Sequence, residues 1–160
     1  MARRNEAERL QELTQLEREF WGKGIFPAGM DEVGRGPLAG PVVAACVILP
    51  AKPLIEFVND SKKLSEGRRE KLAPVIRASA LAVGTGWADA REIDAYNILQ
   101  ATKIAFQRAY DAMGCPCTHV LVDAVKGLSS TRLSMGTHCL TLLQRHPSWQ
   151  RWNAMLICGA

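Results

Sequence analysis

The sequence has no long apolar run and no strong charge imbalance. No hydrophobic stretch approaches the roughly 20 residues that a membrane helix needs, so a membrane is not an expected partner. The first residues, Met1 to Glu6, are charged and lead into no apolar segment, so we expect no signal peptide. The net charge of +4 is a mild basic excess, which is compatible with a nucleic-acid partner but does not identify one.

Cysteine patterns typical of secreted or zinc-binding domains are also missing. The chain has five cysteines, an odd number, and we expect them to be reduced thiols in the cytoplasm. Cys115 and Cys117 have no second pair nearby, and their spacing differs from that of a zinc knuckle. With 160 residues and an ordinary globular composition, the chain is expected to form one domain with a real core.

The most informative stretch is MDEVGRGPLAGP, residues 30–41. Asp31 and Glu32 lead directly into the turn Gly34-Arg35-Gly36, and this combination suggests a divalent metal beside a phosphate-binding backbone. The plain alternative is a pair of solvated turn residues after a strand. Neighbouring strand residues point to opposite faces, so both carboxylates can reach one metal only if the strand ends or bends there. Glycine tolerates positive φ and makes that bend easy.

Hydrophobic periodicity predicts alternating strands and helices along the rest of the chain. Residues 3–20 are expected to form a helix with one apolar stripe: Leu10, Leu13, Leu16 and Phe20. The expected strands are Ile25–Met30, Pro41–Leu49, Leu81–Trp87 and His119–Val122. A helix should begin at Glu66 and kink or split at Pro74, which lacks a backbone donor. Capping boxes at Asp89 and Asn97 precede a longer helix that runs from about Ile98 to Met113.

Two further stretches carry candidate contacts. The segment NDSKKLS, residues 59–65, is either a solvated loop with Ser65 as helix N-cap or a phosphate-contacting loop that uses Lys62 and Lys63. Asp123 directly follows an expected strand, and ligand sites in open α/β sheets lie outside the carboxyl ends of strands. A strand-ending Asp in an ordinary turn is the alternative.

These motifs together resemble ribonuclease HII, the type 2 ribonuclease H, from Ile25 to about Lys126. The matching parts are Met30–Pro50, the NDSKKLS loop, Glu92–Ala109 and the strand ending in Asp123. The resemblance implies a ribonuclease H-like α/β fold, with a mixed central sheet flanked by helices. In it, Asp31, Glu32 and Asp123 would be catalytic and hold Mn²⁺ or Mg²⁺. Substrate contacts would come from Gly34, Arg35, Gly36, Lys62 and Lys63, with the Gly-Arg-Gly backbone at the 2'-hydroxyl.

The implied activity is hydrolysis of the RNA strand of RNA–DNA hybrids, including single ribonucleotides embedded in DNA. The expected products are 5'-phosphate and 3'-hydroxyl ends, and the expected enzyme is a cytoplasmic monomer. One alternative is an inactive, truncated remnant that at most binds the hybrid. Another is a non-catalytic module that binds phosphate through the Gly-Arg-Gly loop. Metal dependence would count against this module, and no P-loop lysine pattern follows the loop.

The chain changes character after Lys126, its last lysine; Asp123 is its last acidic residue. The family's fourth carboxylate and the small-residue run before it are not present. Regrouping the bases one position earlier permits GDAL from residues 135–139 and AAASILAKVERD from residues 143–155, which are family motifs. We therefore expect an N-terminal helical extension (1–24), an incomplete catalytic domain (25–126) and an out-of-frame tail (127–160). The C-terminal part of the domain would then be missing or non-native.

Overall fold

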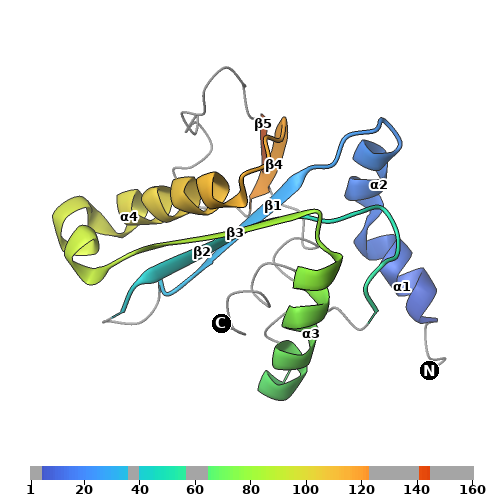
Figure 1. Ribbon diagram of the computed structural model, residues 1–160, viewed down its shortest axis with the longest axis horizontal. Coiled ribbons are helices and arrows are strands. Elements are labelled where there is room, and N and C mark those ends of the chain that lie inside the picture. Colours follow the sequence, from blue (N-terminus) through green and yellow to red (C-terminus); the bar gives the residue numbers. More distant parts are fainter. Residues whose placement is uncertain (1–4, 36–39, 57–64, 123–140, 145–160) are drawn as a thin grey trace.

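The computed structural model describes residues 5–35, 40–56, 65–122 and 141–144 (Figure 1). Four residues singled out by the sequence lie outside these ranges: Gly36, Lys62, Lys63 and Asp123. The helices are α1 (Glu6–Leu13), α2 (Gln15–Trp21), α3 (Glu66–Ser79) and α4 (Ala90–Met113). The strands are β1 (Ala28–Val33), β2 (Val42–Ile48), β3 (Ala82–Ala88), β4 (His119–Val122) and β5 (Thr141–Gln144).

The strands form one mixed sheet in the order β3-β2-β1-β4-β5. β2 pairs antiparallel with both β1 and β3, whereas β4 runs parallel to β1. This confirms the expected antiparallel triplet with a parallel strand beside its first member. The sequence does not predict β5, which lies in the segment after Lys126 and pairs in parallel with β4. The sheet brings β1 next to residues about 90 positions later in the chain, since Ala28 pairs with Val120.

β1 differs from the expected strand at both ends. It covers Ala28–Val33 rather than Ile25–Met30, so Asp31 and Glu32 lie inside the strand. Pairing with β2 continues through both acidic residues, and the chain reaches a positive φ, 99°, only at Gly34. The expectation that the strand ends or bends at the acidic pair is therefore wrong, because the backbone ladder continues past it.

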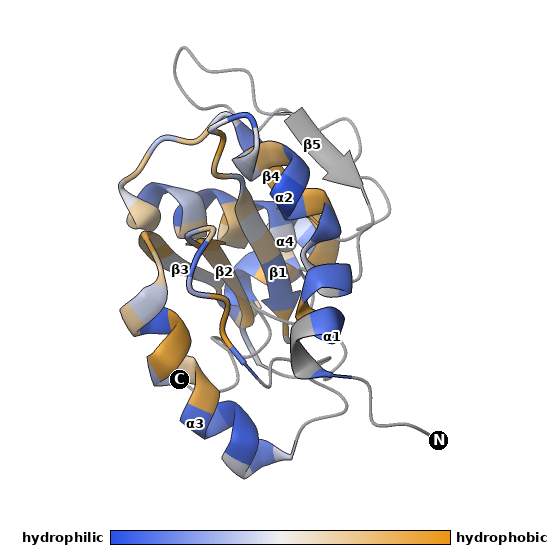
Figure 2. Ribbon diagram, turned by 90° about the vertical axis from the view of Figure 1, so that its right-hand side faces the viewer, coloured by the Kyte–Doolittle hydropathy of each residue, from blue (hydrophilic) through white to orange (hydrophobic). Residues whose placement is uncertain are grey.

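Hydrophobic residues cover both faces of the sheet, since helices pack on both (Figure 2). On one face, Phe106 and Met113 of α4 belong to a cluster with Met30 of β1. On the other face, Ile76 of α3 packs in a cluster with Val47 of β2, and residues of α2 pack against it. In Figure 1, α4 and α3 accordingly lie on opposite sides of the sheet.

The expected N-terminal helix is two helices that meet at Thr14. The Thr14 hydroxyl donates to the carbonyl of Leu10 at 2.8 Å, a local bond that favours a bend. Within the expected stripe, Leu10 is buried, while Leu16 and Phe20 pack against the cluster that contains Ile76. The Phe20 ring also lies 5.1 Å from the ring of His119, measured between centroids. The N-terminal extension is therefore packed on the sheet through α2.

Pro74 does not split α3, which runs unbroken from Glu66 to Ser79. Pro74 is exposed, so water can reach the helix carbonyl that proline leaves without a donor. Ser65 is the N-cap residue, as expected, although its side chain makes no capping hydrogen bond.

Hydrogen bonds from three side chains, those of Asp89, Glu92 and Arg108, stabilise the start of α4. Asp89 and Glu92 form the expected capping box, since each accepts a hydrogen bond from the other's backbone N–H. Arg108 donates to both Glu92 oxygens at 2.8 Å and to the Trp87 carbonyl at 2.7 Å. These hydrogen bonds hold the pKa of Glu92 below its ordinary value. Their stabilisation is present above the unfolded-state pKa and is lost as the pH falls through the folded-state value.

Removing the Asp89 cap should destabilise the fold measurably. Asp89→Ala is expected to lower the free energy of unfolding by about 1 kcal/mol, because the Glu92 N–H loses its acceptor. Urea unfolding monitored by circular dichroism measures the change. Asp94→Ala, an exposed carboxylate within the same helix, is the control. Equal losses in both variants would show that the cap contributes nothing specific.

The second expected capping site interrupts α4. Asn97 has a φ of 69° and a ψ of 163°, a conformation that is costly for any residue except glycine. Its side chain accepts hydrogen bonds from the backbone N–H groups of Leu99 and Gln100, so it caps the following helical segment. The expected helix from Ile98 to Met113 is confirmed as the second part of α4.

Candidate active site

The acidic pair lies near the carboxyl end of β1. Asp31 is paired with Ala45, and Glu32 with Ala44, in the β1–β2 ladder. Because strand side chains alternate, Glu32 lies on the face that α4 covers, and Asp31 on the opposite face. Both side chains are partly buried. The described geometry therefore places the two carboxylates at one end of the sheet without bringing them onto one face.

The turn after β1 depends on glycine at position 34. Gly34 has a φ of 99°, and a Cβ there would lie closer than 3.0 Å to the Pro41 carbonyl oxygen. This close approach lets the chain return directly into β2 beside the carboxylates. Arg35 then folds back, and its Nη1 donates to Glu32 Oε1 at 3.0 Å. The Arg35 charge thus lies next to the acidic pair.

The third candidate carboxylate follows β4 directly. Asp123 itself lies outside the described residues, but it comes immediately after Val122, the parallel neighbour of Met30. Since Met30 immediately precedes Asp31, the strand neighbours required for a shared site are adjacent. Clustering of Asp31, Glu32 and Asp123 stays a prediction, as do the roles of Gly36, Lys62 and Lys63.

The donor chemistry of this end of the sheet fits a hard divalent cation. Asp31 and Glu32 offer carboxylate oxygens, the ligands that Mg²⁺ and Mn²⁺ prefer. Within the described ranges, no three His, Cys, Asp or Glu residues form a group that could hold a metal. The acidic pair would therefore need a further ligand from a residue such as Asp123. On binding the cation, Glu32 would give up its ion pair with Arg35.

An exposed apolar row beside Asp31 was not predicted from the sequence. Val33 pairs with Val43, and Val43 pairs with Trp87, so the three lie side by side on the face of Asp31. Trp87 is 60% exposed and Val33 is 38% exposed. The sequence did carry a hint of it: the bulky residue Trp87 follows Gly84 and Gly86 in a strand expected from residues 81–87. An exposed aromatic ring near an acidic site can stack on a nucleobase or pack on a sugar.

Solved structures of ribonucleases H share the overall fold of this chain. The chain is similar to ribonuclease H2 from Pyrococcus horikoshii OT3, with a TM-score of 0.67, 23% identity, and coverage of 85% of this chain and 68% of that one. It is also similar to Bst-RNase HIII in complex with Mn²⁺, with a TM-score of 0.55, 17% identity, and coverage of 84% and 49%. The fold is therefore ribonuclease H-like.

Sequence comparison narrows this class to a family. A family model described as Ribonuclease HII matches residues 28–142. A Ribonuclease HII from Caldanaerobacter subterraneus subsp. tengcongensis is 50% identical over 121 residues, which cover 75% of this chain and 50% of that relative. The chain belongs to the ribonuclease HII family. It spans about half the length of the curated relatives that it matches first. The family match extends beyond Lys126, where we expected the resemblance to end.

Proposed function

We propose that this chain derives from an endonuclease that hydrolyses the RNA strand of RNA–DNA hybrids, including single ribonucleotides embedded in DNA. Membership of the ribonuclease HII family carries the proposal. The position of Asp31 and Glu32 at the end of β1, beside the parallel strand that leads to Asp123, is compatible with it. The corresponding process is removal of RNA during DNA replication and repair, by a monomer in the cytoplasm.

Asp31, Glu32 and Asp123 would hold Mn²⁺ or Mg²⁺. A bound divalent cation supplies an activated water and stabilises the leaving oxygen, which gives 5'-phosphate and 3'-hydroxyl ends. The Mn²⁺ complex of the RNase HIII with the same fold supports this choice of ion. Arg35 balances the charge of Glu32 before the ion binds.

Recognition of RNA would fall to the turn after β1. The backbone of Gly34, Arg35 and Gly36 would contact the ribose 2'-hydroxyl, the group that distinguishes RNA from DNA. The tight turn at Gly34 beside Pro41 supports this role. Lys62 and Lys63 would contact phosphates, which position a duplex without reading its sequence. Trp87 adds an exposed flat surface on the Asp31 side.

We propose in addition that residues from about Gly127 onward are translated out of frame. The back-translated motifs and the loss of acidic residues after Asp123 support this view. β5 and the family match to residue 142 show that this segment still contributes a strand. An inactive remnant that binds the hybrid without cutting it is the second candidate, favoured by the opposite faces of Asp31 and Glu32.

Cleavage and binding should be measured separately. The substrate is a labelled DNA duplex with one ribonucleotide, incubated with Mn²⁺, with Mg²⁺ or with EDTA, and an all-DNA duplex is the control. The proposal expects metal-dependent cleavage only beside the ribonucleotide, with products mapped to the stated ends, and weak turnover from this chain. Binding of the hybrid with no cleavage under any condition would favour the remnant. Size-exclusion chromatography tests for the monomer.

A further inference from the structure

A groove lies at the end of the sheet opposite to the acidic pair. Its lining comes from α1, α2 and the segment after β2: Gln11, Arg18, Trp21, Ala51, Lys52 and Leu54. The last residue of β2, Ile48, pairs with the first residue of β1, Ala28, so the groove lies beyond the start of β1. It has a volume of about 310 Å³. The groove is therefore separate from the site at Asp31 and Glu32.

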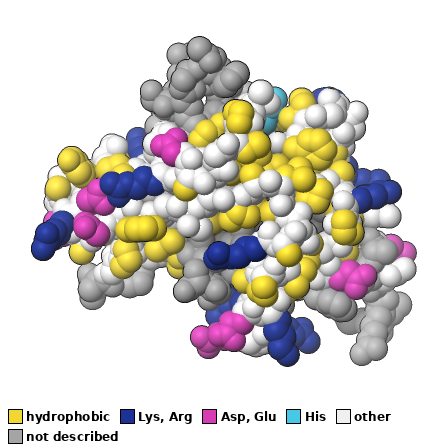
Figure 3. All heavy atoms as spheres, in the orientation of Figure 1, with side chains coloured by type: hydrophobic (Ala, Val, Ile, Leu, Met, Phe, Trp, Pro, Cys, Tyr) yellow, Lys and Arg dark blue, Asp and Glu magenta, His cyan; other side chains and the backbone are white. Residues whose placement is uncertain are grey.

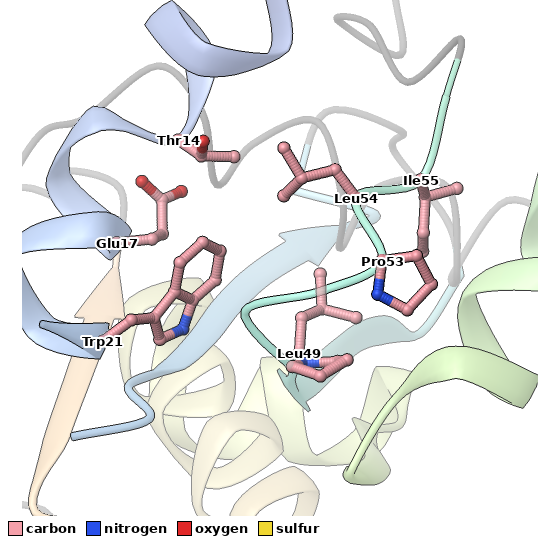
Figure 4. Close-up of a pocket in the computed structure, with 8 residues that line it drawn as sticks. Thr14, Glu17, Trp21, Leu49, Pro53, Leu54 and Ile55 are labelled. Carbon is pink, nitrogen blue, oxygen red and sulfur yellow. The ribbon is translucent and has the colours of Figure 1, made fainter. Parts of the chain in front are cut away.

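The floor of the groove includes apolar side chains. Trp21 and Leu54 line both this groove and a neighbouring pocket (Figure 4). In that pocket Trp21 stands opposite Leu49 and Pro53, and the 2% exposed Glu17 lies beside Thr14. Trp21 thus lies between the two hollows and forms a wall of each.

The rim of the groove is positively charged. Arg18 and Lys52 are both exposed, and Gln11 adds an amide donor. Glu17 and Glu19 flank Arg18 in the chain, but neither lines the groove, and its lining contains no carboxylate. Among the ion pairs of the described residues, none involves Arg18 or Lys52. Two cations, an amide donor and an apolar floor suit an anion attached to a sugar or ring.

We infer that this groove binds backbone phosphates of the substrate duplex away from the cleaved bond. The inference rests on the proposed function, which supplies the polyanion. Three strand residues, about 10 Å, separate Asp31 from Ala28, and Lys52 follows Ile48, the strand partner of Ala28, by four residues that span at most about 14 Å. The groove therefore lies roughly 10–24 Å from Asp31, which is about three to seven base pairs at about 3.4 Å per pair. Contacts of this kind strengthen binding without reading sequence.

Figure 3 shows that apolar side chains cover the middle of the face seen in Figure 1, with charged side chains mostly around its margin. A polyanion is therefore held by cations near the ends of the molecule rather than by the centre of this face. Helices α1 and α2 lie at one end of the molecule (Figure 1), and Arg18 of α2 lines the same groove as Lys52. This placement makes the N-terminal extension part of the binding surface.

The experiment compares the full chain with the double variant Arg18→Gln/Lys52→Gln. Arg77→Gln, an exposed cation on α3 that does not line the groove, is the matched control. The probes are fluorescent duplexes with a central ribonucleotide, one of about 24 base pairs and one of about 8, which extends only about four base pairs, roughly 14 Å, to either side of the ribonucleotide. Anisotropy in EDTA measures affinity between low and moderate salt. Circular dichroism checks that each variant is folded.

Two phosphate contacts contribute about 1.8 to the slope of log affinity against log salt, so a fourfold rise in salt costs about tenfold through them. On the long duplex, the salt slope of the double variant should be smaller by about 1.8 than that of the parent chain. On the short duplex, the two chains should have the same slope and affinity. Unchanged slopes on the long duplex, or an equal loss in Arg77→Gln, would overturn the inference. The inference would also be overturned if a polyglutamate peptide bound the parent chain but not the double variant, while both chains bound the duplex equally. The partner would then be an acidic protein.

The outcome is distinguishable from that of the proposed function. If the chain cuts beside the ribonucleotide but the double variant has an unchanged salt slope, the proposed function stands and the groove inference is wrong. If the chain never cuts but the double variant binds the long duplex more weakly, the groove is a nucleic-acid site and the proposed function is wrong.

Discussion

Restoring the reading frame after Lys126 is expected to raise cleavage beside a ribonucleotide by about a hundredfold or more. The family resemblance implies a fourth carboxylate in the restored segment, and the present chain has no acidic residue after Asp123. Losing one ligand from a two-ion site removes charge stabilisation worth several kcal/mol, and about 1.4 kcal/mol corresponds to tenfold in rate.

The assay is cleavage of a duplex with one ribonucleotide, with Mn²⁺, by this chain and by a frame-restored chain. Asp31→Asn in the restored chain is the control, and its activity should fall to background because the proposed metal ligand on β1 becomes neutral. Stability should also rise on restoration, because selected residues would replace a tail whose sequence was not selected to fold. Equal, full activity in both chains would show that the tail is functional and that the frame hypothesis is wrong.

Adding a methyl group at Gly84 is expected to be severely destabilising. β3 and α4 approach so closely that a Cβ on Gly84 would lie closer than 3.0 Å to backbone atoms of Ala109 and Met113. A backbone cannot move aside as the end of a flexible side chain can, so α4 must shift away from the sheet. Overpacking typically costs about 1–3 kcal/mol, and a clash with helix backbone should reach about 3 kcal/mol or more.

Thermal unfolding of Gly84→Ala should show a melting temperature lower by roughly 10 °C. Gly67→Ala is the matched control, because the added methyl group meets no atom within 4 Å. This control lies in α3, where alanine is the better helix former by about 1 kcal/mol, so it should be neutral or stabilising. A Gly84 variant as stable as the parent chain would mean that α4 and β3 can separate freely.

The sequence alone determined much of the fold. Apolar runs bounded by glycine and proline located β2 and β3 to within one residue, and strand order followed from the family resemblance. The capping box at Asp89 was readable because it depends on residues three apart, whose hydrogen bonds form locally. The motif at residues 30–41 identified the family, since its residue types and order are unusual together.

Tertiary structure decided what depends on partners far along the chain. Sequence could not show that β1 continues through Asp31 and Glu32, because a strand extends as long as its neighbour offers hydrogen bonds, and β2 does so up to Val43. Pro74 does not split α3 for a related reason: tolerance of a missing donor depends on whether solvent reaches the carbonyl.

The groove beyond the start of β1 also arises only on folding. Arg18 and Lys52 carry no shared motif, and each alone is an ordinary exposed cation. Packing of α2 on the sheet through Phe20, and the turn after β2, bring them to one rim over Trp21. Local sequence determines helices and caps because their hydrogen bonds join near neighbours, and it locates strands through their apolar runs. Burial, close backbone approach and charge clustering join distant residues, and only the folded chain decides them.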